Sequence, residues 1–281
     1  MNNLNHQNEQ PFPKPTEAIA VVFFTYIFTI GISLLHSLFS EMPGQLPESK
    51  AFQFMEIVVF IPFFIYLFIR KFPLTTTLRL RLVPLNVVAY SVVVGVSITF
   101  LIAELDYLIG LIFPLPEELL QSIEQLMTAN SFSELVIIFT SAVLFAGIFE
   151  EMLFRGFFQQ AFENSKMDLT TAIFFTSLIF ALFHIPWWYV QTTIFGIIIG
   201  VMAWKSESIL PGVIVHAINN AINIFLINVD EKHYQWLEWK GHISPPILAV
   251  AALGIYWGIQ KLYQHYEQPP APVEGDESFY K

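Results

Sequence analysis

Two adjacent glutamates and one arginine stand inside a long apolar stretch of the chain. Residues 149–157 read Phe-Glu-Glu-Met-Leu-Phe-Arg-Gly-Phe, between the flanking runs LVIIFTSAVLFAGIF and FFQQAF. A charged side chain at the centre of a bilayer costs about 2.5–3.5 kcal/mol on insertion scales, so such groups face protein or a wet cavity and mark functional sites. Glu150, Glu151 and Arg155 are therefore the first candidates for chemistry.

The two glutamates are not equivalent if this stretch is helical. Glu151 and Arg155 are then i, i+4 neighbours in the favourable acid-first order and can form an ion pair. Glu150 points about 100° away around the helix and has no cationic neighbour in its own segment. We therefore predict that Glu151 is paired with a structural arginine, whereas Glu150 can act as a base.

Two further polar sites lie in apolar segments. His184 follows Phe180 by one helical turn, and beside Trp187 and Trp188 it could also be an ordinary interfacial histidine. His216 and Asn220 share one helix face, together with Asn223. Polar stripes of that kind also serve simply as hydrogen-bonding contacts between membrane helices. Neither site alone indicates catalysis.

Glu104 and Asp106 interrupt a third apolar segment. They are another candidate site, but the alternative that we prefer is a membrane span that ends early at the outer surface. They are therefore not included among the predicted catalytic groups.

The order of the motifs, Glu-Glu-x-x-x-Arg, Phe-x-x-x-His and His-x-x-x-Asn, resembles that of the CPBP (formerly Abi) intramembrane peptidases, which are related to the type II CAAX prenyl proteases. The resemblance covers about residues 131–230. It implies that a glutamate and a histidine activate water while a His/Asn pair stabilises the oxyanion. Substrates in this family are prenylated CAAX proteins, leader peptides, pheromones or other membrane proteins. Some members have immunity or secretion roles.

The chemistry of the residues leads to the same assignment. Hydrolysis of a peptide bond requires a base that holds water and donors for the oxyanion. A neighbouring like charge and a low dielectric raise the basicity of a carboxylate, which favours Glu150 as the base. His184 would orient the water or relay its proton. Asn220 and His216 would donate hydrogen bonds to the same oxygen. The predicted catalytic set is thus Glu150, Glu151, His184, His216 and Asn220.

Other mechanisms fit the sequence less well. Glu150, His184 and His216 could form a His₂Glu zinc site, but no H-E-x-x-H motif is present, so we expect neither a metal nor another cofactor. No G-x-S-x-G motif supports a serine peptidase. A non-catalytic transporter, scaffold or bacteriocin immunity factor remains the alternative. Transporters often contain repeated halves, whereas these polar sites are confined to the fourth, fifth and seventh apolar segments.

Composition places the chain among membrane proteins. Of its 281 residues, 55% are hydrophobic and only 13% are charged, compared with about 25% charged residues in soluble domains. No nucleic-acid partner is indicated, and the absence of cysteine excludes disulfides and thiol catalysis. We expect an all-α polytopic bundle of about eight transmembrane helices, at residues 18–39, 51–69, 86–113, 132–163, 168–187, 189–204, 208–228 and 244–262.

The expected organisation is a polar tail at 1–17, one membrane-embedded domain at 18–262 and an acidic, proline-rich tail at 263–281. Four basic residues lie between the second and third spans, which places that loop in the cytoplasm: Arg70, Lys71, Arg79 and Arg81. With eight spans, both termini would be cytoplasmic and the acidic loop 114–131 would lie outside. The expected partners are the lipid bilayer of the cell membrane and a membrane-associated protein or peptide substrate. No substrate-binding residue or oligomeric state is indicated.

Overall fold

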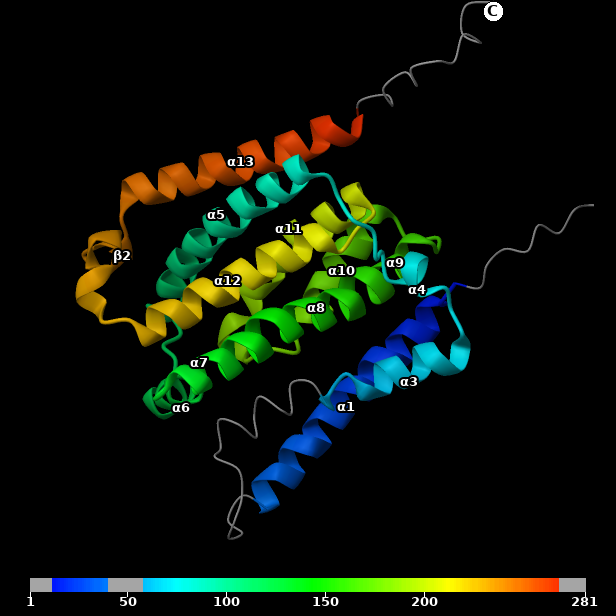
Figure 1. The fold of residues 1–281 in the computed structure, drawn as a ribbon, viewed down its shortest axis with the longest axis horizontal. Coiled ribbons are helices and arrows are strands. Elements are labelled where there is room, and N and C mark those ends of the chain that lie inside the picture. The colour runs from blue at the N-terminus through cyan, green and yellow to red at the C-terminus, as the bar shows by residue number, and fades with distance from the viewer. Residues whose placement is uncertain (1–11, 40–57, 268–281) are drawn as a thin grey trace, which may run out of the picture.

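The computed structural model describes residues 12–39 and 58–267, which form a bundle of helices with one very short hairpin (Figure 1). The first half of the described chain contains α1 (Pro15–Phe39), α3 (Ile61–Arg70), α4 (Leu74–Thr77), α5 (Leu85–Gly110) and α6 (Glu117–Met127). The second half contains α10 (Leu169–Ala181), α11 (Tyr189–Ser206), α12 (Leu210–Asn228) and α13 (Pro245–Glu267). Between α12 and α13 lie two short 3₁₀ turns and the antiparallel pair β1 (Glu238–Trp239) and β2 (His242–Ile243).

A continuous helical rod from Phe132 to Glu163 joins the two halves. It consists of α7 (Phe132–Ile138), the π-helix η1 (Phe139–Phe145), α8 (Ala146–Glu151), the π-helix η2 (Met152–Phe158) and α9 (Gln159–Glu163). Its N-terminus is capped by Ser131, whose hydroxyl accepts a hydrogen bond from the backbone N–H of Glu134 at 3.2 Å. Such a cap satisfies one of the otherwise unpaired donors of the first turn. The rod therefore starts where the polar sequence ends.

In the described part of the chain, five helical segments are long and apolar enough to cross a membrane: Pro15–His36, Leu85–Gly110, Phe132–Glu163, Pro186–Ser206 and Leu210–Asn228. Two shorter apolar helices, Ile61–Arg70 and Leu169–Ala181, accompany them. Each of the eight predicted spans overlaps a helix, and residues 51–57 of the second span lie outside the described ranges. The prediction of an all-α, multi-pass membrane bundle is confirmed.

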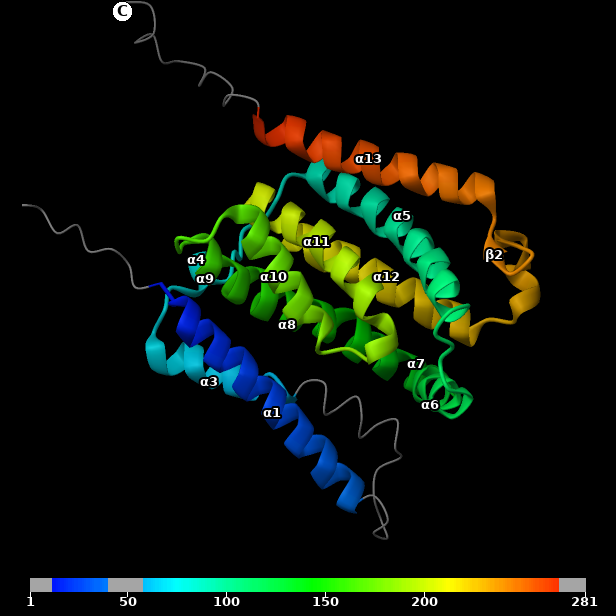
Figure 2. The same ribbon diagram turned by 180° about the vertical axis from the view of Figure 1, so that it is seen from behind.

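The bundle has the long rod at its centre. Figures 1 and 2 show α13 lying along α5 on one side, with α12 between α5 and the rod. On the opposite side α1 and α3 lie together, and α1 packs against η2 and α9. The helices α10 and α11 form a tight pair beside the rod. The rod is thus enclosed by helices from both halves of the sequence.

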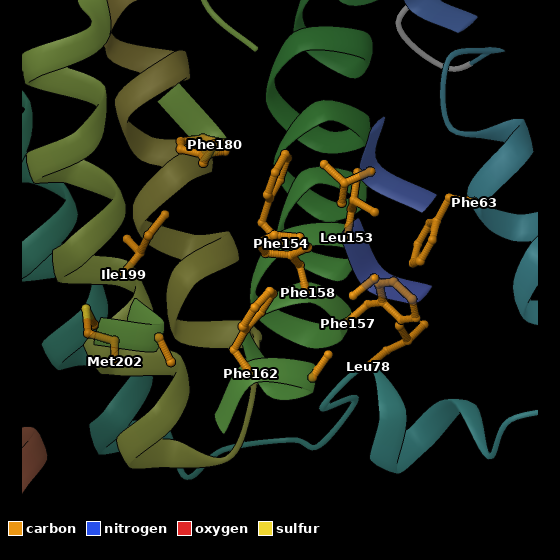
Figure 3. Close-up of a cluster of buried hydrophobic side chains, with 14 of the residues drawn as sticks. Phe63, Leu78, Leu153, Phe154, Phe157, Phe158, Phe162, Phe180, Ile199 and Met202 are labelled. Carbon is orange, nitrogen blue, oxygen red and sulfur yellow. The ribbon is translucent and has the colours of Figure 1, made fainter. Parts of the chain in front are cut away.

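Aromatic packing anchors the rod in the bundle (Figure 3). Phe154, Phe157 and Phe158 are each at most 1% exposed. The ring of Phe157 packs edge-on against Phe63 of α3, with the centroids 5.4 Å apart. The ring of Phe154 packs in the same way against Phe180 of α10, at 5.1 Å. Buried aromatic side chains of this size dominate core energetics, so these contacts fix the rotation of the rod about its axis.

Three boundaries differ from the sequence-based expectations. Residues 117–127 of the expected outer loop form α6, whose first turn carries Glu117 and Glu118, acidic residues that stabilise a helix N-terminus. The fifth span ends at Ala181 rather than at residue 187, because Ile185 precedes a proline and is extended. The last helix continues to Glu267, five residues beyond the expected boundary at 262.

Candidate active site

Glu150 and Glu151 lie in α8, the single α-helical stretch between the two π-helices of the rod. A π-turn changes the angular spacing of side chains along a helix and occurs frequently at functional sites. Here one π-helix ends five residues before Glu150 and the other begins directly after Glu151. The two carboxylates are therefore presented by a short regular segment with an irregular segment on each side.

Glu151 is fully buried and is held by two partners. Its Oε1 atom accepts a hydrogen bond from Nη1 of Arg155 at 3.0 Å, and both side chains are 0% exposed. The same oxygen lies 3.1 Å from Nδ1 of His216 on α12. Because a carboxylate only accepts hydrogen bonds, Nδ1 of His216 carries a proton. Glu151 thus joins the rod to α12 and fixes the orientation of the His216 ring.

Glu150 has a different environment. Its side chain is 23% exposed, and Oε2 lies 3.9 Å from Nε2 of His216. That distance is too long for a direct hydrogen bond. Oε2 is nevertheless buried and has no hydrogen-bond partner within the described ranges. If a single water formed hydrogen bonds of about 2.8 Å to both atoms, with the two bonds near a right angle, the atoms would lie roughly 4 Å apart. The pair is therefore spaced to hold a single water.

His184 lies in the turn 182–185 that follows α10. Its Nδ1 atom is 3.1 Å from the carbonyl oxygen of Phe180. Since a carbonyl only accepts, the proton of a neutral His184 is on Nδ1, and Nε2 is left as an acceptor. The centroid of the Phe180 ring is 4.8 Å from that of His184 and 6.1 Å from that of His216. His184 is therefore linked to His216 through Phe180, whereas the described ion pairs include none between His184 and a glutamate.

The helix α10 is short for a membrane span. Its 13 residues extend about 20 Å at 1.5 Å per residue, compared with a hydrocarbon core of about 30 Å. The turn that follows it holds His184 in a half-buried position.

Asn220 lies on α12 one turn after His216. Its Nδ2 group donates a hydrogen bond to the carbonyl oxygen of Ala142 at 2.8 Å. Ala142 is part of the π-helix η1. An amide nitrogen carries two protons, so the second N–H of Asn220 is still available to another acceptor. The described contacts join Asn220 to the rod, but they include none between Asn220 and either glutamate.

Phe180 is a member of the site whose role the sequence did not reveal. Its ring centroid is 4.8 Å from that of His184, 6.1 Å from that of His216, and 4.1 Å from Cζ of Arg155. A guanidinium at that distance from a ring is stabilised by cation–π attraction. The only sequence signal was the i, i+4 spacing of Phe180 and His184. Phe180 therefore provides an apolar contact shared by all three basic side chains.

Glu104 and Asp106 do not join this cluster. The helix α5 continues through both of them to Gly110, so they lie within a helix and not in a loop that follows it. Glu104 instead accepts hydrogen bonds from Nδ1 of His242 and from the backbone N–H of Ile243, both at 2.8 Å. Asp106 accepts one from Gln191 at 2.7 Å. These carboxylates hold the β1–β2 hairpin and α11 against α5.

Within residues 12–39 and 58–267, no group of three or more His, Asp or Glu side chains is arranged to hold a metal ion. His184 and His216 each use Nδ1 for a contact inside the protein, an arrangement that also orients histidines whose Nε2 binds a metal.

Comparison with known families assigns the same region. Residues 132–222 match the family model described as Type II CAAX prenyl endopeptidase Rce1-like. The matched segment begins at the first residue of α7 and includes all the predicted site residues from Glu150 to Asn220. No curated protein and no solved structure matched the chain. The match confirms the resemblance indicated by the motifs and supports a CAAX-type intramembrane protease kind of function.

Proposed function

We propose that this protein is a metal-independent intramembrane endopeptidase that uses Glu150 to activate water against a peptide bond of a membrane-associated protein or peptide. The observation that carries the proposal is the environment of Glu150. Its Oε2 atom is buried without a hydrogen-bond partner in the described structure and lies 3.9 Å from Nε2 of His216. A carboxylate in this position can accept a proton from a water held between the two groups.

The steps of the reaction follow from these residues. Glu150 takes one proton from the water, and the resulting hydroxide attacks the carbonyl carbon of the scissile bond. The C–N bond of the tetrahedral intermediate then breaks. The proton held by Glu150 passes to the departing nitrogen, so that one water is consumed and the carboxylate is regenerated. His184, with its free Nε2 acceptor, orients the water or shares the transfer of its proton.

The oxyanion is stabilised by α12. His216 lies between two carboxylates, and opposite charges on both sides favour the protonated ring. A protonated His216 donates from Nδ1 to Glu151 and from Nε2 into the site. Asn220 supplies the amide N–H that Ala142 does not use. Preorganised donors of this kind typically contribute about 2.7–4 kcal/mol each to the stabilisation of a transition state.

The site also carries a balanced set of charges. Two carboxylates, one guanidinium and one protonated imidazole sum to zero. The balance matters because an isolated charge in an apolar interior is far more costly than a paired one. When water gives a proton to Glu150, the negative charge moves from the carboxylate to the hydroxide. The net charge of the site, with the hydroxide included, stays at zero.

The function can be tested before any substrate is known. Cells that produce either the wild-type protein or Glu150→Gln at equal levels are compared by mass spectrometry of newly formed N-termini in their membrane fractions. We expect termini in membrane-associated proteins or peptides that occur only with the wild-type protein. Identical sets of termini in the two samples would contradict the proposal and favour a non-catalytic role.

A further inference from the structure

A row of buried polar side chains continues along the rod beyond the active site. Glu151, Arg155, Gln159 and Glu163 are spaced four residues apart, and the first three are 0% exposed. We call these four residues the polar stripe. In an α-helix of 3.6 residues per turn, residue i+4 lies slightly more than one full turn around the axis from residue i. In the wider π-helix, residue i+4 lies slightly less than one full turn from residue i. The alternation of α9 with η2 therefore keeps the stripe on one face.

The stripe contains several polar atoms that lack a protein partner. They are Oε2 of Glu151, Nε and Nη2 of Arg155, and Oε1 of Gln159, all buried and without a hydrogen bond to any described residue. Each such atom costs about 1–3 kcal/mol, and more if it is charged. Four of them would remove most of a typical folding free energy of about 5–15 kcal/mol. A folded protein requires another source of hydrogen bonds for these atoms.

Helices α11 and α12 face the stripe with glycines. A Cβ atom at Gly196 would lie 3.1 Å from Nη2 of Arg155, and one at Gly200 would lie 2.9 Å from Oε1 of Gln159. A Cβ atom at Gly212 would lie 2.9 Å from Oε2 of Glu151. The missing side chains at these three glycines therefore let the backbones of α11 and α12 approach the unpartnered atoms closely.

The far end of the stripe meets a nearly buried ion pair. Gln159 donates to Oε1 of Glu163 at 2.7 Å and to the carbonyl oxygen of Gly200 at 3.0 Å. Glu163 forms an ion pair with Arg79, and these side chains are 11% and 8% exposed. Arg79 also donates to the carbonyl oxygen of Arg155 at 3.2 Å. The polar contacts are therefore continuous from the active site to the Arg79–Glu163 pair.

We infer that the polar stripe binds a file of water molecules that connects the Arg79–Glu163 end of the bundle with the active site. Buried waters typically make about three hydrogen bonds to polar groups that otherwise lack partners, which is what the stripe offers. If the proposed hydrolysis is correct, on which this role rests, the file supplies the water consumed in each turnover. A substrate bound on the exposed side of Glu150 would block direct access of water from that side. Gln159 is the positioning residue of the file.

Because the protein contains no cysteine, the file can be tested with single cysteines. Ser177 lies beside the stripe, since a Cβ atom at Gly196 would contact both Ser177 and Arg155. Ser91 on α5 is the matched control. Both serines are at most 1% exposed, and both donate to the carbonyl four residues earlier at 2.8 Å. X-ray radiolysis forms hydroxyl radicals from bound water, which oxidise adjacent side chains, and mass spectrometry measures the oxidation rate.

We expect Ser177→Cys to be oxidised several-fold faster than Ser91→Cys in the folded protein in lipid. Adding Gln159→Leu to Ser177→Cys should reduce its rate towards that of Ser91→Cys. Equal rates for Ser177→Cys and Ser91→Cys would overturn the inference without any need for the leucine variant. A rate at Ser177→Cys that is unchanged by Gln159→Leu in a folded protein would overturn the role of Gln159.

Turnover gives a separate readout. Gln159→Leu should lower kcat and leave KM unchanged, because the residue does not contact the substrate, and a wild-type kcat would contradict the role in supply. The radiolysis result does not depend on turnover. Fast oxidation of Ser177→Cys together with an active Glu150→Gln would therefore reject the proposed function and retain the file.

Discussion

At the scale of single residues, the two adjacent glutamates are separated by their partners. Glu151 is fixed by Arg155 and His216 through the same oxygen, at 3.0 and 3.1 Å. For Glu150, the one ion-pair contact in the described part of the chain is with Nε2 of His216, at 3.9 Å. His216 therefore contacts a structural carboxylate with one nitrogen and faces the proposed base with the other. The i, i+4 spacing predicted the first partner of Glu151, but only the packing of α12 against the rod shows the second.

The buried ion pair leads to a prediction about stability. Removing one member of a buried pair leaves the other charge unpaired, at a cost of about 3–5 kcal/mol. We expect Arg155→Met and Glu151→Gln each to lower the thermal unfolding temperature in detergent substantially. The double variant should be less destabilised than the sum of the single variants, because neither charge is then left alone. Additive losses would show that the two side chains do not stabilise the fold as a pair.

Gly212 gives a sharper test of how Glu151 is held. An alanine at this position would place Cβ 2.9 Å from Oε2 of Glu151, closer than such contacts occur, so the carboxylate must shift. We expect Gly212→Ala to reduce both cleavage and thermal stability. Gly31→Ala on α1 is the control, since a Cβ atom there meets nothing within 4 Å and alanine is favoured over glycine in a helix by about 0.5–1 kcal/mol. Equal effects of the two substitutions would contradict the described packing.

At the scale of helices, hydropathy predicted where the long apolar helices lie, but it did not predict the residues at which all of them end. Residues 182–188 are as apolar as the helix before them, so composition extended the fifth span through His184. The chain instead turns after Ala181, because Pro186 forces the preceding residue out of the helical conformation. The π-helices were not predicted either. An apolar run with few polar positions has no periodicity that distinguishes a π-turn from an α-turn.

The start of α10 gives a prediction about pH. Asp168 caps this helix by accepting a hydrogen bond from the backbone N–H of Thr171 at 2.9 Å. The hydrogen bonds from the Thr171 hydroxyl and backbone lower the pKa of Asp168. Since the folded pKa is below the ordinary value of about 3.9, this contribution to stability is complete above that value. It is lost as the pH falls through the folded pKa.

The cap can be isolated by substitution. Asparagine also caps helices but does not ionise, so Asp168→Asn should weaken the acid dependence of the unfolding temperature below about pH 4 while retaining most of the stability near neutral pH. The measurement is thermal unfolding of both proteins across this range. Parallel pH profiles would exclude Asp168 as the titrating group.

At the scale of the whole molecule, the sequence predicted candidate site residues, but it could not show how their helices pack. Glu150, His184 and His216 come from three separate segments, and their contacts depend on how α10 and α12 pack against the rod. Phe180 was recognised only as part of a motif, although its ring contacts His184, His216 and Arg155. Contacts between helices depend on distances that a single sequence does not contain.

The proposed chemistry also predicts the metal requirement of the whole protein. In the proposed steps Glu150 takes the proton from water, and no Lewis acid is needed. We expect purified protein to contain much less than one zinc ion per chain and to retain its cleavage activity in a strong chelator. Metal analysis near one zinc per chain, with activity lost on chelation and restored by zinc, would contradict the metal-free mechanism.

The most direct test of the central claim is the cleavage rate of purified Glu150→Gln on a substrate identified from the membrane fractions, measured together with its unfolding temperature. Among the described residues, no ion-pair partner lies within hydrogen-bonding distance of Glu150, so the amide should leave the fold intact. Loss of a general base typically costs ~10²–10⁴-fold in rate. We predict a loss of that size at an unfolding temperature close to that of the wild-type protein. Near-normal cleavage by Glu150→Gln would contradict the account, and an inactive but equally stable Glu151→Gln would transfer the role of base to Glu151.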